Sequence, residues 1–354
     1  MIERGNKIQK NDCKPRTRFI HKNNMATANV AKGQVHEYEF EKYLCEADNI
    51  KENILKYGVA ICPILDDSEC ENMIKNKWDV LEHLTSNFET PIDRNNRETY
   101  KQISELFPNH KMLIQHWKMG HSKLAWDVRQ NEKVIDAFAK IWGTDDLIVS
   151  FDGASIYILD KPKRENNSWF HVDQSYLRND FECIQSWINA YDTNEGDATL
   201  VLLENSNQYH KDFRDKFNIT DKKDWFKLEN EEQYNFYIDK GCRNVAIKCP
   251  RGHGVFWDSR TLHYGNPVQK NASENYNYRC VVYVCMVPRN FAKAKDLDKR
   301  KKIFNDLRMT SHWPNKPTLF SKYPRTYGKP IQSVKDISID DVKKYINERG
   351  IKLI

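Results

Sequence analysis

The chain has 354 residues, with 56 lysines and arginines against 50 aspartates and glutamates, for a formal net charge of +6. This length is ample for burying a core, and so small an excess of positive charge gives no strong signal for nucleic-acid binding. No apolar stretch approaches the roughly 18 residues of a membrane span, so the sequence predicts no transmembrane helix.

The nine cysteines indicate reduced thiols rather than a disulfide framework or a zinc ribbon. No CxxC pair occurs, and several cysteines lie within apolar runs such as "RCVVYVCMV" at 279–287. An odd number of cysteines in such runs is typical of buried free thiols, which predicts a cytoplasmic protein.

Residues 1–36 are expected to form a polar, basic arm that is loosely ordered. The stretch "MIERGNKIQKNDCKPRTRFIHKNN" carries basic residues without a following apolar core, so it is not a signal peptide. A basic arm can bind nucleic acid or a protein partner, but a solvated tail is the favoured interpretation.

A mainly helical region is predicted over 37–146, as support for a β core. The stretch 66–84 starts with Asp66 and Asp67 as candidate N-caps and carries apolar residues at helical spacing. The stretch 131–143 has the same spacing and ends at Gly143, a favourable C-cap. Before both of them, "GVAICPIL" at 58–65 predicts a short buried strand.

From residue 147 the chain changes to short runs rich in β-branched and aromatic residues, separated by Asn, Gly, Asp and Pro. The runs lie at 147–159, 182–191, 197–204, 244–249, 254–259 and 279–287. Their number and spacing predict a jelly-roll or cupin-like barrel, that is, a double-stranded β-helix, over 147–290. The predicted fold class is therefore mainly β with flanking helices (α+β).

Two segments flank or interrupt this core. Residues 205–244 are predicted to form a polar, helix-like insertion within a single domain over 37–292. Residues 293–354 are predicted to add a helix and a Pro-rich segment that wraps around this same domain. Since loops on a rigid barrel often carry specificity, the insertion is a candidate lid. Its aromatic residues either cover a pocket or, as we favour, form the packing face of a helical insert: Trp225, Phe226, Tyr234, Phe236 and Tyr237.

A His-x-Asp pair occurs twice, and a bare pair is a weak signal because about one match is expected by chance. In "NNSWFHVDQSY", His171 and Asp173 directly follow a predicted strand, where residues i and i+2 point to the same face. The second pair, His210 and Asp212, lies in a helical segment, where the two side chains diverge. We expect His210 to lie on the surface and discard it as a ligand.

A third ligand is expected from another strand. His263, in "RGHGVFWDSRTLHYGNPV", lies at a strand end and is the best candidate, while His253 lies in a turn and ranks second. Two imidazoles and one carboxylate leave coordination positions open, which suits non-haem Fe(II), although Zn(II) or Mn(II) can use the same ligands.

Arg279 is a candidate anchor for an anionic cosubstrate. It opens the strand after His263, and an inward-facing guanidinium among apolar residues is costly unless it is paired. Such a group can hold a carboxylate through two parallel hydrogen bonds. The alternative is a strand-edge arginine that faces solvent, and the presence of the three candidate ligands favours the anchor.

These residues resemble the phytanoyl-CoA dioxygenase family of Fe(II)- and 2-oxoglutarate-dependent oxygenases. The resemblance rests on "HVD", "TLHYGNP" and Arg279, and it covers about residues 145–290. It implies that His171, Asp173 and His263 bind the iron and that Arg279 anchors 2-oxoglutarate.

Further cosubstrate contacts are implied for Trp187, Tyr157 and Asn266. Two departures from the family bear on this set. Arg279 lies farther beyond His263 than the family's arginine does, and Tyr264 and Gly265 replace the family's Gly-Ser, which weakens the case for Asn266.

The resemblance implies a reaction with O₂ that converts 2-oxoglutarate to succinate and CO₂ and hydroxylates a C–H bond of a small-molecule substrate. Since Asp173 fills the position that is a small residue in related halogenases, hydroxylation is favoured. Gln174 and Arg260 are candidate substrate contacts, although a structural hydrogen bond is the favoured role of each. Two alternatives remain: a cupin-type metal isomerase or dioxygenase that does not use 2-oxoglutarate, and a non-catalytic jelly-roll binding protein.

Overall fold

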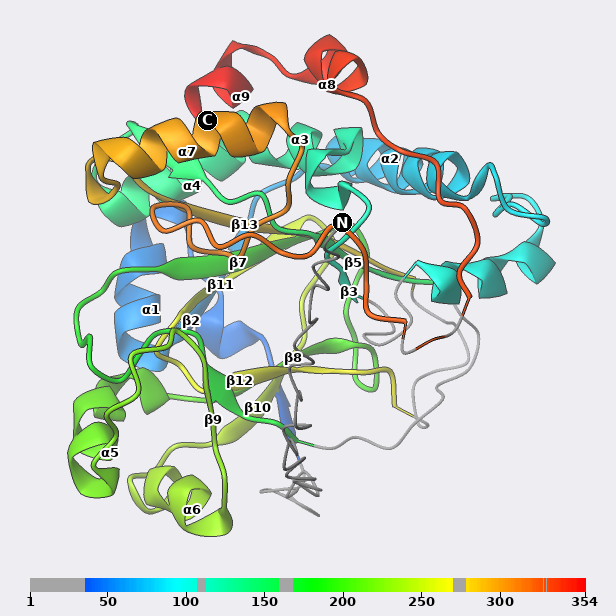
Figure 1. Ribbon diagram of the computed structural model, residues 1–354. Helices are drawn as coiled ribbons and strands as arrows, with labels where there is room; N and C mark the ends of the chain where they lie inside the picture. Colours follow the sequence, from blue (N-terminus) through cyan, green and yellow to red (C-terminus); the bar gives the residue numbers. More distant parts are fainter. Residues whose placement is uncertain (1–35, 107–112, 159–167, 270–277, 327, 329) are drawn as a thin grey trace, which may run out of the picture.

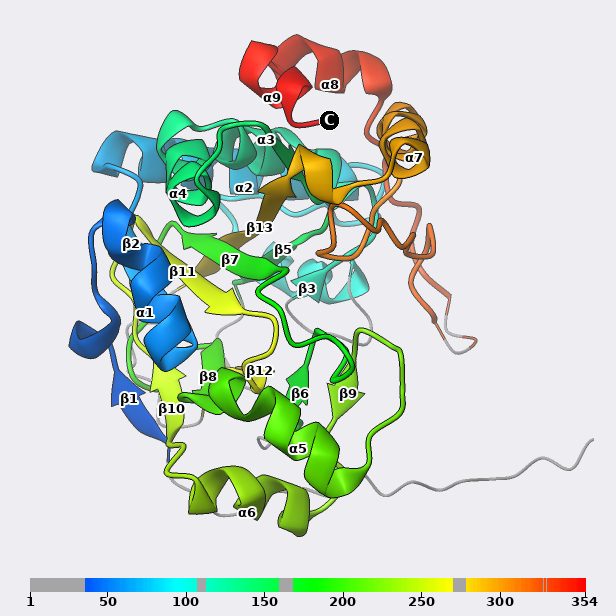
Figure 2. The same ribbon diagram turned by 90° about the vertical axis from the view of Figure 1, so that its left-hand side faces the viewer.

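The computed structural model describes residues 36–106, 113–158, 168–269, 278–326, 328 and 330–354. Two β-sheets face each other, with a group of helices over the outer side of one sheet and the 205–244 insertion beyond the other (Figures 1 and 2). The predicted N-terminal arm, apart from His36, lies outside the described residues.

The first sheet has six strands, antiparallel except for the pair β1 and β10. Their spatial order is β1 (Glu37–Glu39), β10 (Asn244–Ile247), β8 (Thr199–Leu203), β12 (His263–Asn266), β6 (His171–Val172) and β9 (Phe226–Lys227). The last strand, β9, comes from the insertion, which therefore supplies an edge of this sheet as well as helices.

The second sheet has seven antiparallel strands. Their order is β2 (Val59–Pro63), β11 (His253–Asp258), β7 (Ile184–Asn189), β13 (Arg279–Pro288), β5 (Ala154–Tyr157) and β3 (Leu113–Ile114), with β4 (Leu147–Val149) paired to the far end of β13. The two-sheet arrangement is the predicted double-stranded β-helix.

Strand alternation fills the space between the sheets with apolar side chains. Leu202 and Val245 of the first sheet pack there against Trp187 and Val281 of the second, and all four are buried. The outer face of each sheet is covered as well, so the strands are buried on both faces. This is why the predicted strand segments are apolar at nearly every position.

Helices cover the outer face of the seven-stranded sheet (Figure 2). They are α1 (Ile50–Tyr57), α2 (Asp67–Thr85), α3 (Lys123–Arg129), α4 (Glu132–Trp142), α7 (Ala294–Asn305), α8 (Ile339–Tyr345) and α9 (Glu348–Lys352). Short 3-10 helices lie at Glu41–Tyr43, Ala47–Asn49, Arg97–Glu105, Met119–His121, Ser206–Tyr209 and Arg289–Phe291. Asp66 caps α2 in a capping box with Glu69, and Gly143 ends α4 at φ +72°, as predicted.

The insertion packs on the outer face of the six-stranded sheet through α5 (His210–Phe217) and α6 (Glu231–Asp239). Tyr234, Phe236 and Tyr237 are buried there and Phe226 is half-buried, so these four form the packing face that we favoured. Trp225 differs, because half of its surface is exposed (50%).

The prediction that His210 lies on the surface is wrong. α5 turns His210 inward with Phe213, three residues later on the same helical face, and both are buried. The imidazole stacks on Tyr176 at 4.3 Å, and its Nε2 lies 3.1 Å from the carbonyl oxygen of Ser175. Burial lowers the pKa of His210 to about 4, which keeps the ring neutral.

The described cysteines are all free thiols, and seven of the eight are buried. Among the described residues, no helix combines the length and the apolar character needed to cross a bilayer. The C-terminal segment wraps over the helical side and ends in α8 and α9, two short helices that the sequence pattern did not predict.

Lys77 on α2 gives a prediction about stability. Its buried ammonium donates to the Tyr191 hydroxyl (2.8 Å) and lies 4.0 to 5.4 Å from the ring centres of Trp78, Tyr191 and Tyr278. Burial lowers the pKa of Lys77 from 10.5 to about 8. Between these two values the unfolded chain holds a proton that the folded chain lacks, so this group adds stability as the pH rises.

Lys77→Met removes this contribution. As the pH rises from 8 to 10, we expect the variant to lose up to about 2 kcal/mol of stability relative to the parent. Cation–π attraction of the folded ammonium would make this loss smaller. Urea unfolding at both pH values measures the difference. Lys75→Met, on the same helix with an exposed side chain, should show no such trend, and a matching trend there would contradict the assignment.

Candidate metal centre

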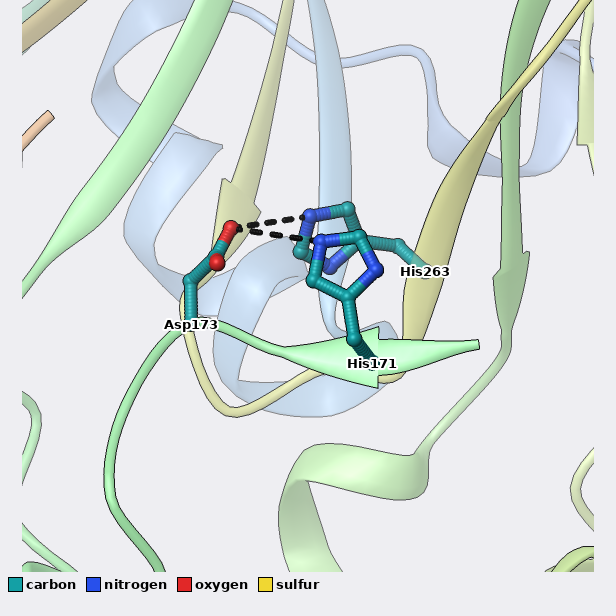
Figure 3. A group of neighbouring side chains, drawn as sticks. All are labelled: His171, Asp173 and His263. Carbon is teal, nitrogen blue, oxygen red and sulfur yellow. Dashed lines mark ion pairs between the residues drawn. The ribbon is translucent and has the colours of Figure 1, made fainter. Parts of the chain in front are cut away.

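Three side chains that the sequence analysis selected converge in the structure (Figure 3). His171 lies on β6, Asp173 directly follows it, and His263 lies on β12. His171 and His263 are direct cross-strand partners, so both imidazoles project from the same face of the sheet. One ligand atom from each of the three lies within 4.8 Å of the others.

The hydrogen bonds of the two imidazoles fix which nitrogen faces the cluster. Nδ1 of His171 lies 3.2 Å from the Trp169 carbonyl oxygen, and Nδ1 of His263 lies 2.8 Å from that of Thr261. A carbonyl oxygen only accepts, so each Nδ1 carries a proton, and Nε2 is the ring nitrogen left to face the cluster.

Both Nε2 atoms point toward Asp173 (Figure 3), at 3.7 Å for His171 and 3.2 Å for His263 from carboxylate Oδ2. Three potential ligand atoms therefore meet in one place, where a cation could bind all of them. The donor set of two imidazoles and a carboxylate, with the outer ring nitrogens held by carbonyls, fits a divalent transition metal.

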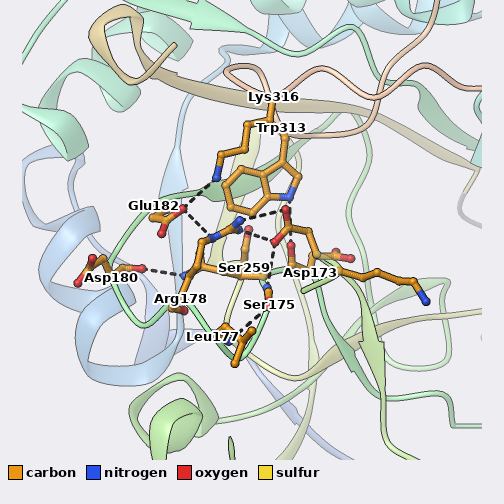
Figure 4. A network of polar contacts seen from close by, with 12 residues as sticks. Asp173, Ser175, Leu177, Arg178, Asp180, Glu182, Ser259, Trp313 and Lys316 are labelled. Carbon is orange, nitrogen blue, oxygen red and sulfur yellow. Dashed lines mark hydrogen bonds and ion pairs between the residues drawn. The ribbon is translucent and has the colours of Figure 1, made fainter. Parts of the chain in front are cut away.

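Asp173 is held from three directions. Gln185 on β7 donates to Oδ2 (3.0 Å), the Asp173 amide donates to the Ser259 carbonyl (2.9 Å), and the Trp313 indole donates to the Asp173 carbonyl (3.1 Å). Figure 4 shows Ser259 and Trp313 around Asp173. Nearby, Glu182 forms ion pairs with Arg178 and Lys316. The C-terminal segment thus helps to fix a candidate ligand.

The electrostatics favour an ionised Asp173 carboxylate beside a neutral His263. Burial alone would raise the pKa of Asp173, but its interactions with His312, His171 and His263 hold that pKa well below its usual value. Burial, reinforced by the neighbouring His171, lowers the pKa of His263. These are the protonation states that a metal ion requires of its ligands.

Gln185→Leu is expected to weaken divalent-metal binding by about 10- to 100-fold, the usual cost of losing an outer partner of a ligand. The amide of Gln185 orients Asp173, and leucine cannot donate to the carboxylate. Anaerobic titration with Co(II), followed by its visible absorption, measures the affinity. Gln208→Leu, which alters an exposed glutamine whose side chain donates to the Lys56 carbonyl, serves as the control. Equal affinities in the two variants would contradict the role of Gln185.

Arg279, the predicted anchor, projects between the two sheets. Its cross-strand partner is Tyr157, its Nε donates to the Ser155 hydroxyl (2.9 Å), and one terminal nitrogen donates to the Ala198 carbonyl (2.7 Å). The guanidinium lies 5.3 Å from the centre of the Trp187 ring. It is buried (7% exposed), and among the described residues it forms no ion pair, so its charge is open to an anion.

The three other predicted cosubstrate contacts differ in position. Trp187 and Tyr157 share the inner face with Arg279. Tyr157 is its cross-strand partner, and the Trp187 ring contacts the guanidinium. Asn266 follows His263 by three positions on β12, and alternation puts it on the opposite face with Tyr264, which packs in the insertion core. The register therefore does not bring Asn266 to the other predicted site residues, and its contact stays a prediction.

The two candidate substrate contacts make internal hydrogen bonds. Gln174 is fully buried, and its amide nitrogen donates to the carbonyls of Arg178 and Asp180 (2.9 Å each). Arg260 pairs with Asp258 (2.6 Å) and donates to the Asn179 carbonyl. These contacts favour the structural role for both, and a role in substrate binding stays a prediction.

His253, the second-ranked ligand, begins β11 and is not part of the cluster. Its Nδ1 lies 2.9 Å from the Arg251 carbonyl, and its ring packs edge-on against Phe40 at 6.0 Å. The metal-ligand geometry therefore favours His263, which was ranked first.

Three partners of the site were not predicted from the sequence: Gln185, Ser155 and Trp313. Each acts through a single hydrogen bond across strands or segments that are distant in the chain. For Gln185 and Ser155 a signal existed in principle, because each is a polar residue on the inner side of an otherwise apolar run.

A surface hollow of 430 Å³ lies elsewhere, among α2, α3, α4 and the start of α9. It contains none of the three candidate ligands. Its charged groups already pair with one another, as in Lys133 with Glu69 (2.7 Å) and Arg349 with Glu132 (2.6 Å), so it offers no comparable reactive group.

Comparison with known proteins agrees with this architecture. No protein-family profile matches the chain. A curated relative, Ava biosynthesis cluster protein O of Aspergillus versicolor, is 28% identical over 242 residues, which is 65% of this chain and 75% of the relative.

Two solved structures share the fold. A hypothetical protein of Escherichia coli, JW0805, superposes with a TM-score of 0.54 at 12% identity over 88% of this chain and 85% of that one. GlcNAc Inducible Gene 2 of Candida albicans superposes with a TM-score of 0.50 at 14% identity over 88% and 79% of the two chains. Fold and site together define the class: a double-stranded β-helix protein with a candidate His–Asp–His metal centre, as the resemblance implies.

Proposed function

We propose that the protein is an Fe(II)- and 2-oxoglutarate-dependent oxygenase that hydroxylates a C–H bond of a small organic substrate. The observation that carries the proposal is the convergence of His171, Asp173 and His263, whose ligand atoms lie within 4.8 Å of one another. Three protein donors leave positions open for a cosubstrate and for oxygen, as in non-haem iron enzymes.

When bound, Fe(II) supplies the oxidative decarboxylation of 2-oxoglutarate by O₂ to succinate and CO₂ and the oxidation of the substrate C–H bond. The protein holds the metal through Nε2 of both histidines and the Asp173 carboxylate. Thr261 and Trp169 keep the two Nδ1 protons in place, and Gln185 orients the carboxylate.

Arg279 supports 2-oxoglutarate as the cosubstrate. A buried guanidinium without a carboxylate partner among the described residues is electrostatically costly, and an incoming carboxylate would offset that cost. Ser155 and the Ala198 carbonyl fix the plane of the guanidinium, so its remaining N–H groups are preorganised for an anion.

Anaerobic titration tests the proposal. Fe(II) and 2-oxoglutarate together should produce a visible charge-transfer band, and admission of O₂ should release succinate, with Zn(II) in place of Fe(II) giving neither. Absence of the band at saturating Fe(II) and 2-oxoglutarate would contradict the proposal.

The substrate and the cellular setting remain proposals. The curated relative is named for a biosynthesis cluster, which supports a small-molecule substrate here. The free thiols support a cytoplasmic location. The cupin-type alternative needs the same ligands but no Arg279, and a non-catalytic binding protein predicts no succinate release.

A further inference from the structure

Strand β9 places two side chains of the insertion beside the candidate metal centre. In register, Lys227 on β9 faces His171 on β6, which faces His263 on β12. Directly opposed residues share one face of a sheet, so the Lys227 side chain lies on the face that carries both imidazoles. Trp225, two residues earlier, is on that face as well, while Phe226 between them packs into the insertion core.

Two exposed indoles flank the His171 imidazole. Trp169 stacks on it at 4.6 Å with an interplanar angle of 8°, and Trp225 lies 5.9 Å away, tilted by 36°. Trp169 is 39% exposed and Trp225 is 50% exposed. Large rings left in solvent at a reactive centre mark a surface that an apolar or flat molecule can cover.

Lys227 adds a positive charge to this surface. The side chain is half-buried, and no ion pair or hydrogen bond of its ammonium is seen with any residue in the described parts of the chain. Lysines in other parts of the structure do find carboxylates, as Lys316 does with Glu182. An ammonium that is partly withdrawn from water and unpaired favours an anionic partner.

The segment is held in place before any ligand arrives. The Asp224 carboxylate accepts from the Ser175 amide (3.0 Å) and pairs with Arg178 (2.5 Å). The Ser175 hydroxyl donates to the Asp221 carbonyl (2.9 Å). Ser175 and Arg178 follow Asp173 closely in the chain (Figure 4), so the segment that carries Trp225 is tied to the loop that carries a candidate ligand.

We propose that β9 recognises the substrate and that this substrate is an organic acid with a flat, apolar body. Its carboxylate would pair with Lys227, and its body would lie against Trp225 and Trp169, next to the metal. The proposal rests on the proposed function, since it names the substrate class of that site. In this proposal the anion at Lys227 is distinct from 2-oxoglutarate, whose predicted anchor, Arg279, lies on the other sheet.

Calorimetric titration with 2-naphthoate and its neutral amide tests the charge. We expect the acid to bind the metal-free protein about tenfold more tightly than the amide, the size of one charge-assisted hydrogen bond. Lys227→Met should reduce the preference to less than about twofold, while Lys223→Met, a change of an exposed lysine in the same segment, keeps it. Arg279→Met should also keep the preference for the acid. Loss of the preference in this variant would mean that the acid binds at the cosubstrate anchor.

The aromatic contact has its own test. Trp225→Ala should weaken the binding of acid and amide alike by about tenfold. Tyr323→Ala, which removes an exposed ring that packs on Trp117, should weaken neither. The proposal is overturned if wild-type protein binds neither compound, if the acid has no advantage, or if its advantage is lost in Arg279→Met and kept in Lys227→Met.

The readouts separate this proposal from the oxygenase proposal, because the titrations need no metal. A charge-transfer band that persists in Lys227→Met and Trp225→Ala, with naphthoate binding weakened as expected, supports both proposals. Naphthoate binding without any band supports recognition at β9 and contradicts only the oxygenase.

Discussion

His263→Ala is expected to abolish Fe(II) binding and, with it, the release of succinate. The substitution leaves two protein donors from one segment, His171 and Asp173, and removes the donor that β12 brings from a different part of the chain. We expect the affinity for Fe(II) to fall by more than about 100-fold, beyond the usual cost of losing an outer partner. Anaerobic Fe(II) titration and succinate assays measure the two effects.

The matched control is His253→Ala, since His253 is half-buried, contacts the Arg251 carbonyl through Nδ1 as the ligands contact theirs, and lies outside the cluster. Circular dichroism should show that both variants keep the β-rich fold. If Fe(II) affinity is unchanged in His263→Ala and falls in His253→Ala, the ranking of the two histidines is reversed and the proposed centre is contradicted.

Local patterns were sufficient for most of the fold. Apolar periodicity and capping residues predicted α2 and α4 with ends close to those observed, because Asp66 and Gly143 satisfy backbone groups within a single turn. Short β-branched runs predicted the strands of the core, since a strand covered on both faces must be apolar throughout.

Pairing between distant segments could not be predicted in this way. Strand β9 is two residues long inside a polar insertion, and only its register with β6 shows that Lys227 stands beside His171. His210 was misplaced for a similar reason: its helix is polar in composition, but Phe213 and the Tyr176 ring make one side of it a core face.

The site was predictable where the chemistry is local. His171 and Asp173 are two apart, and His263 follows an apolar strand, so strand geometry alone indicated a shared ion. The same geometry speaks against Asn266, which stands an odd number of positions from His263 and so faces away. Trp313 could not be anticipated, because its indole reaches Asp173 from a segment without regular structure.

The structure divides the proposed tasks between its two sheets. The six-stranded sheet carries the candidate metal ligands and, at its edge, Lys227. The seven-stranded sheet carries Arg279 and, through Gln185, orients Asp173. Loss of the metal and loss of the cosubstrate should therefore be separable by substitution.

Arg279→Met is expected to weaken 2-oxoglutarate binding by about 100-fold while leaving Fe(II) affinity unchanged. Methionine retains much of the apolar stem against Trp187 but offers no donor to a carboxylate. Arg279→Lys keeps the charge without the planar pair of donors, so it should lose about tenfold. Titration of the Fe(II)-loaded protein with 2-oxoglutarate, followed through the charge-transfer band, gives the affinities.

Arg289→Met is the control for the loss of an arginine, because this residue pairs with Asp146 on the surface, away from the space between the sheets. It should leave both affinities unchanged. Since the methionine at 279 also leaves the Ala198 carbonyl without its donor, urea unfolding should accompany the titration, and some loss of stability is expected. If Arg279→Met stays folded and binds 2-oxoglutarate as tightly as the parent, the guanidinium is not the anchor. Paired with loss of activity in His263→Ala, that result would select the cupin-type enzyme, which needs the metal ligands and makes no use of this charge.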